Sequence, residues 1–80
     1  MAPEAFHVLT RDGDGCAEVV EILRTLEAGG TSREAAGFAK CLYVTRAEQT
    51  VVMVRDRASP LAAELRGRPG WREPGDAPPG

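Results

Sequence analysis

Apolar side chains recur at helical spacing in one long stretch of this chain. Between residues 16 and 28 they form the three-four pattern of an amphipathic helix, and charged residues fill the opposite side. The apolar positions are Cys16, Val19, Val20, Ile22, Leu23 and Leu26. Gly29 and Gly30 follow at once, and glycine commonly supplies the left-handed conformation that ends a helix. The pattern predicts one helix over residues 16–28.

Three shorter stretches have the pattern of strands. Residues 5–11 form a β-rich run in which Phe6 and Val8 share one face. Residues 38–46 and 50–57 predict two strands, and the turn between them is so short that they must pair antiparallel. The second strand of this hairpin is apolar on both faces, which is typical of a central strand.

The C-terminal part contains one more helix signal. Ser59 suits the N-cap position and Pro60 the first helical position, and a short apolar stripe follows before Gly67. A capping box over residues 31–34 also predicts one or two helical turns at 32–36. The expected fold is therefore α+β, a small β-α-β-β-α domain in which a three-stranded sheet with an antiparallel hairpin packs on one amphipathic helix.

The chain from residue 68 onward contains four prolines and three glycines, which break regular structure. We expect a single domain over residues 1–72 and a disordered, acidic, Pro/Gly-rich tail over residues 73–80. Trp71 is the large apolar side chain in this region that can fold back onto the domain.

A chain of eighty residues builds only a small core. The long helix can cover only one face of the predicted sheet, and the second face also contains apolar residues. Either the short second helix or another polypeptide must cover that face. The candidate protein interface consists of Phe38, Leu42, Val44, Val51 and Met53. If the faces are reversed, the alternates are Cys41, Tyr43, Val52 and Val54.

Charge is unevenly distributed along a chain of net charge −2. Residues 1–30 hold six acids and two bases, whereas residues 31–72 hold eight bases and four acids. Opposite signs in the two parts favour internal pairing or a surface with two poles. A cluster of arginines defines an alternative, nucleic-acid-binding surface: Arg46, Arg55, Arg57, Arg66, Arg68 and Arg72. Tyr43 is the only strand aromatic near them, so the usual stacking platform is missing.

The stretch TRDGDGCAE, residues 10–18, looks like the beginning of a calcium loop. An EF-hand loop starting at Asp12 needs oxygen ligands at its fifth and twelfth positions, where this chain has Cys16 and Leu23. The stretch is better interpreted as a strand-to-helix corner in which Asp14 caps the helix. One histidine, His7, and two cysteines are too few for a typical metal centre, so we expect no metal and no cofactor.

No Ser-His-Asp, Cys-His or paired-carboxylate set is recognisable, and we do not expect an enzyme. An enzymatic hypothesis would use Cys16, in the first helical turn, or His7 as the reactive group. We expect Cys16 and Cys41 instead to be buried structural thiols. The chain shows neither a signal peptide nor a membrane span, so we expect a cytoplasmic protein with reduced thiols.

The segment Cys41-Leu-Tyr-Val, then VVMVRD at residues 51–56 and Trp71 downstream, resembles the pattern of a family of small actinobacterial proteins. Those proteins accompany helix-turn-helix regulators, are β-rich, and carry a Cys-x-x-Val strand followed by a Val-x-Val-Arg-Asp strand. The resemblance covers residues 41–57 and Trp71, and the first strand and long helix have no counterpart in it. We therefore do not identify the chain as a member of that family.

Together these patterns predict a small bacterial protein-interaction module without catalytic activity. It would act as a homodimer, or as an accessory or regulatory subunit of a larger protein, through the apolar sheet face and the hairpin. Binding of nucleic acid through the arginines is the alternative, and no membrane partner is expected.

Overall fold

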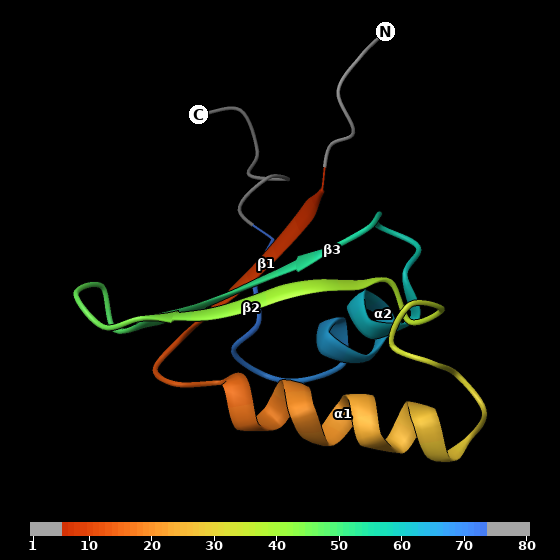
Figure 1. Ribbon diagram of the computed structural model, residues 1–80. Helices are drawn as coiled ribbons and strands as arrows, with labels where there is room; N and C mark the ends of the chain where they lie inside the picture. Colours follow the sequence, from red (N-terminus) through yellow and green to blue (C-terminus); the bar gives the residue numbers. More distant parts are fainter. Residues whose placement is uncertain (1–5, 74–80) are drawn as a thin grey trace, which may run out of the picture.

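The computed structural model describes residues 6–73, which form three strands and two helices (Figure 1). In chain order the elements are β1 (His7–Asp12), α1 (Cys16–Ala28), β2 (Phe38–Val44), β3 (Gln49–Val54) and α2 (Pro60–Arg66). This is the predicted α+β fold with the predicted order of elements, and α1 has the predicted bounds.

The last strand in the sequence, β3, is the central strand of the sheet. It pairs antiparallel with β1 on one side and with β2 on the other. This position explains why β3 is apolar on both faces. Val52 and Val54 are fully buried on the helix side, whereas Val51 and Met53 lie on the opposite side and are half-buried.

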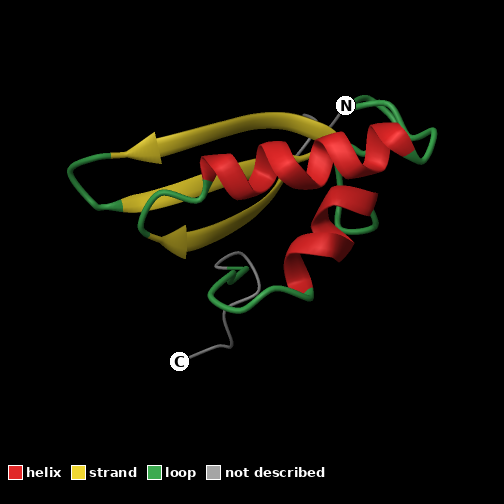
Figure 2. Cartoon of the chain, turned by 90° about the horizontal axis from the view of Figure 1, so that it is seen from below, coloured by secondary structure: helices red, strands yellow, loops and turns green. Residues whose placement is uncertain are grey.

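Both helices lie on the same side of the sheet (Figures 1 and 2). The buried residues of α1 and α2 share one core with buried residues of β1 and β3. This core consists of Leu9, Val19, Ile22, Leu23, Ala36, Val52, Val54, Leu61, Ala62 and Leu65. Burial of each large aliphatic side chain contributes about 1.5–3 kcal/mol, so this one-sided core is the main source of stability. The short helix α2 therefore does not cover the second face of the sheet.

The corner between β1 and α1 is held by Thr50 of the central strand. The buried Thr50 hydroxyl accepts a hydrogen bond from the Gly15 N–H at 2.6 Å and donates one to the Gly13 carbonyl at 2.6 Å. Gly13 has a φ of +78°, which glycine adopts without strain. Asp14 Oδ1 accepts from the Cys16 N–H at 3.1 Å, but Gly15 rather than Asp14 is the N-cap residue. The stretch TRDGDGCAE therefore forms the corner between β1 and α1.

Residues 33–37 form hydrogen-bonded turns and not the short helix predicted at 32–36. Ser32 Oγ accepts from the Ala35 N–H at 3.1 Å, as a capping serine does, but Gly37 turns the chain away with a φ of +83°. The Gly37 carbonyl then accepts from the Arg55 N–H at 2.8 Å. The turn is therefore bonded to the chain that leaves β3.

The segment after α2 returns to the sheet. Thr10 and Arg72 exchange two backbone hydrogen bonds, of 2.8 and 2.7 Å, so Arg72 pairs with the outer edge of β1. Trp71 is half-buried and packs against the core. The predicted tail over 73–80 lies outside the described residues except for Glu73, which forms ion pairs with the domain.

We expect Gly37→Ala to destabilise the protein much more than Gly30→Ala. Both glycines have a positive φ, +83° and +98°, so each substitution loses roughly 1 kcal/mol to left-handed strain. A Cβ at Gly37 would also overlap the side chain of Ser59, whereas a Cβ at Gly30 meets nothing within 4 Å. Urea unfolding at pH 7 should show a total loss of about 3 kcal/mol for Gly37→Ala. Equal losses for the two variants would contradict the close packing at Ser59.

Candidate protein-binding face

The sheet face opposite the helices carries a continuous set of apolar side chains. We call it the open face and define it by Phe6, Val8, Leu42, Val44, Val51 and Met53. Phe6, Leu42 and Val44 are 46%, 43% and 39% exposed, and the other three are half-buried. Among residues 6–73, no helix or strand packs over this face (Figures 1 and 2).

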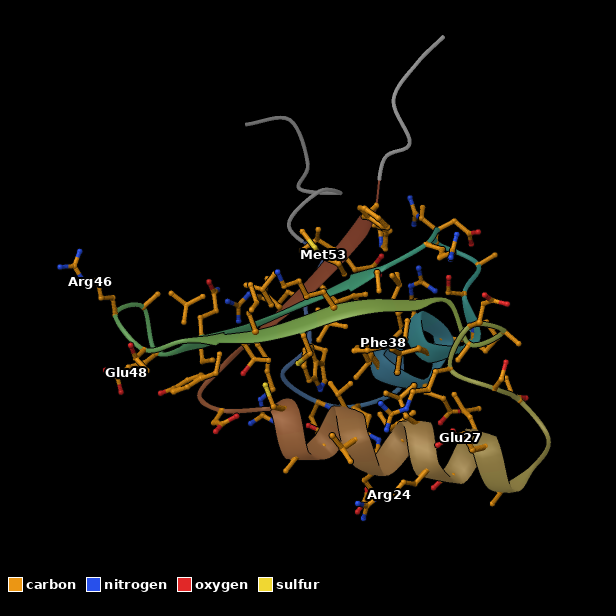
Figure 3. All side chains as sticks on the ribbon, viewed as in Figure 1. Arg24, Glu27, Phe38, Arg46, Glu48 and Met53 are labelled. Atoms are coloured by element: carbon orange, nitrogen blue, oxygen red, sulfur yellow. The ribbon has the colours of Figure 1, made fainter. Side chains whose placement is uncertain are left out.

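The strand register aligns these side chains in rows across the sheet. In one row Val51 lies between Thr10 and Leu42. In the next row Met53 lies between Val8 and Lys40, so a cation borders the apolar surface. Figure 3 shows Met53 pointing away from the helices. The open face is therefore formed by all three strands.

The structure brings together four of the five residues predicted as the interface, namely Leu42, Val44, Val51 and Met53. Phe38 lies on the helix side and packs against the core, so its predicted place on the same face is wrong (Figure 3). The cause is an irregularity in β2 between Phe38 and Lys40, which shifts the two-residue alternation. The predicted interface also left out Phe6 and Val8, which share one face of the first strand. They join this surface because β1 pairs with β3 in a register that sets Val8 opposite Met53.

The alternate residues lie on the helix side of the sheet. Val52 and Val54 are buried there, and Cys41 lies opposite Val52 and packs against the core. Tyr43 is 36% exposed, and the hairpin tip beyond it extends past the start of α1 (Figure 1).

The edges of the sheet differ from each other. The backbone of Arg72 occupies the outer edge of β1 at Thr10. In the part of the chain that the structure describes, no strand pairs with the outer edge of β2. The N–H and C=O groups along that edge can therefore pair with another strand.

The six arginines predicted as a nucleic-acid contact do not form one surface. Arg66 pairs with Glu73, Arg68 with Glu18 and Glu21, and Arg72 with Asp12. The remaining three lie at opposite ends of β3. Arg46 is exposed at the hairpin tip (Figure 3). Arg55 and Arg57 follow the other end of β3, a strand about 20 Å long. The predicted internal pairing of acidic and basic parts is found instead.

Glu18 is the centre of that pairing. Its Oε1 accepts hydrogen bonds from Arg11 Nη1 at 2.6 Å and from Trp71 Nε1 at 3.1 Å, and its Oε2 from Arg68 Nη1 at 3.3 Å. The Arg11 guanidinium also lies 5.9 Å from the centre of the Trp71 ring. Burial acts to raise the pKa of Glu18, but these donors outweigh it and lower the pKa. Glu18 thus fastens the C-terminal segment to α1.

Glu73 forms a second fastening point. Arg66 donates to its carboxylate from Nε at 2.8 Å, and His7 Nε2 contacts the other oxygen. The hydrogen bond from Arg66 is the main cause that lowers the pKa of Glu73 to about 2, although burial opposes it. His7 is therefore a hydrogen-bonded part of the scaffold.

The two thiols lie side by side and are half-buried, whereas buried structural thiols were expected. Cys16 Sγ and Cys41 Sγ are 3.2 Å apart, and both cysteines are free. Residues 6–73 contain no pocket and no group of three or more side chains suited to hold a metal ion. None of their helices is long and apolar enough to cross a lipid bilayer.

No family model, no curated protein and no solved structure matches this chain.

We expect Glu18→Ala to loosen the contact of Trp71 with the domain. The substitution removes the acceptor of the indole N–H and the partner of Arg11 and Arg68. Trp71 is the only tryptophan, so its fluorescence emission should shift to the red and acrylamide should quench it more strongly. The control is Glu27→Ala on the same helix, where the carboxylate has only an exposed pair with Arg33 at 3.9 Å. Identical spectra for the two variants would contradict the role of Glu18.

We expect Glu73 to contribute stability that acid removes. Its folded pKa lies near 2 and the usual unfolded value is about 4.3, so the unfolded chain binds more protons between these values. The contribution is complete above pH 5 and is lost as the pH falls toward 2. At pH 7 Glu73→Gln should cost about 1 kcal/mol of unfolding free energy, allowing for solvent screening of the partly exposed pair. The difference from the wild type should vanish near pH 2 in urea unfolding, and a constant difference would contradict the assignment.

Proposed function

We propose that this protein is a small, non-catalytic protein-interaction module and that a protein partner binds its open face. The partner is a second copy of the chain, or a larger protein of which this chain is an accessory or regulatory subunit. The observation that carries the proposal is the packing of both described helices on one face of the sheet. Within residues 6–73 this leaves the apolar residues of the open face without a covering helix or strand. Removal of such a surface from water favours association.

The dimensions of the open face support a binding mode that includes the sheet edge. Three strands about 4.8 Å apart and six residues long cover a flat area of roughly 300 Å². A stable interface buries about 800 Å² on each partner, so the partner must also contact the border of the face. The outer edge of β2 has no partner strand among residues 6–73, and it adjoins Leu42 and Val44, two of the most exposed residues of the open face. We therefore propose that the partner contributes a strand that pairs with β2.

Charge adds a requirement for the partner surface. Lys40 is exposed and shares a row with Met53, so it meets whatever covers that row. A partner with an apolar centre and a carboxylate near Lys40 would match this arrangement, because an unpaired ammonium group is costly to remove from water.

The nucleic-acid alternative has weaker support. A phosphate backbone would have to compete with the carboxylates that already pair with Arg66, Arg68 and Arg72. Nucleic-acid affinity through arginines falls steeply with salt, whereas apolar association changes little. The salt dependence of binding therefore separates the two hypotheses.

We expect Val44→Glu to weaken association at least about tenfold and Val20→Glu to leave it unchanged. The two valines are a matched pair, 39% and 38% exposed, but Val44 lies on the open face and Val20 on α1. A charge at Val44 would be removed from water on binding, and 1.4 kcal/mol of that cost corresponds to a factor of ten. Sedimentation equilibrium at low and high salt measures self-association, and circular dichroism verifies that each variant is folded.

If the wild-type protein stays monomeric, the test moves to a foreign partner. The wild-type chain and the Val44→Glu chain are then used in parallel to capture that partner. Capture by the wild type alone would support the open face as the binding surface. The proposal would be overturned if folded Val44→Glu associated as strongly as folded Val20→Glu, or captured the partner as well as the wild type.

A further inference from the structure

The fold brings the two cysteines of the chain into contact, although 25 positions separate them. Cys16 is the first residue of α1, and Cys41 lies in the middle of β2. Their sulfur atoms are 3.2 Å apart, and both side chains are partly accessible to solvent. Since the chain has only these two cysteines, each has the other as its sole intramolecular partner.

Regular structure on both sides holds this contact in place. Cys41 is paired with the buried Val52 of the central strand, which fixes it on the helix side of the sheet. The start of α1 is held by Thr50, whose hydroxyl bonds to Gly15 next to Cys16. The proximity of the thiols therefore follows from the same bonds that position α1.

We propose that Cys16 and Cys41 form a redox-modification site, at which a small-molecule disulfide oxidises the two thiols to an intramolecular disulfide. This chemistry is independent of the proposed binding function of the open face. It assigns a role to a pair of nucleophilic side chains that the open face does not use.

The two thiols have different roles in this reaction. Burial is the main cause that raises the pKa of Cys41 to about 12, and its hydrogen bond to Cys16 acts in the same direction. Cys41 therefore remains a protonated thiol at neutral pH, and thiolates are the reactive form. The first attack on the small disulfide is made by Cys16.

The reaction proceeds in two balanced exchange steps. The Cys16 sulfur, having lost its proton to solvent, attacks one sulfur of the small disulfide. A mixed disulfide forms, and one small thiolate leaves and takes up a proton. The Cys41 sulfur then loses its proton and attacks Cys16 Sγ, which expels the second small thiol. Two protein thiols are oxidised by two electrons in total, and one small disulfide is reduced to two thiols.

The test uses the full chain and oxidised glutathione as the probe. Alkylation followed by intact-mass analysis should show a product that has lost two hydrogen atoms, with little glutathione adduct. The product closes a loop between residues 16 and 41, so its melting temperature should rise by roughly 10–20 °C relative to the reduced protein. Dithiothreitol should restore the reduced mass and melting temperature.

Single variants test the order of events. Cys41→Ser should stop at the mixed disulfide on Cys16, whereas Cys16→Ser should react at least about tenfold more slowly through Cys41. The wild-type chain alone keeps the proposal falsifiable if a variant does not fold. Stable glutathione adducts without an intramolecular disulfide, or a lower melting temperature after oxidation, would overturn it.

Discussion

The buried hydroxyl of Thr50 fixes the corner on which the arrangement of this molecule depends. Thr50 lies on the central strand, and its two hydrogen bonds hold the Gly13 carbonyl and the Gly15 N–H against the sheet. These bonds set where α1 begins and on which side of the sheet it runs. A methyl group in place of the hydroxyl would leave two backbone groups without a partner, at a cost of about 1–3 kcal/mol for each buried group. One hydroxyl thereby links strand pairing to helix placement.

The placement of α1 has consequences on both sides of the sheet. On the helix side, its acidic face meets the basic segment after α2, and Glu18 draws Arg11, Arg68 and Trp71 together. The C-terminal segment then completes the cover of the core. On the other side of the sheet lies the open face, because both helices within residues 6–73 pack on the helix side. A domain of this size buries only a small core, and that core lies on the helix side of the sheet.

Features with a strong local cause were predictable from the sequence, and features that depend on distant contacts were not. The periodicity of residues 16–28 and the glycines after them predicted α1 with its bounds, and the short turn predicted the antiparallel hairpin. The central position of β3 was consistent with its apolar faces, but the strand order itself is a matter of tertiary pairing. Phe38 was misplaced because a backbone irregularity interrupts the alternation of β2. The contact between the thiols of Cys16 and Cys41 follows from strand order and helix direction together, and neither cysteine carries a local sign of it.

The backbone pair between Arg72 and Thr10 limits the geometry of assembly. It occupies the edge of β1 at the middle of that strand, whereas the edge of β2 is unpaired within residues 6–73. If two copies of the domain join edge to edge through β2, they are related by a two-fold axis and form one continuous six-stranded sheet. The outer edges of that sheet are then two β1 strands, each interrupted by its own Arg72. Further copies find no equivalent edge, so association through strands closes at two and does not extend into a fibre.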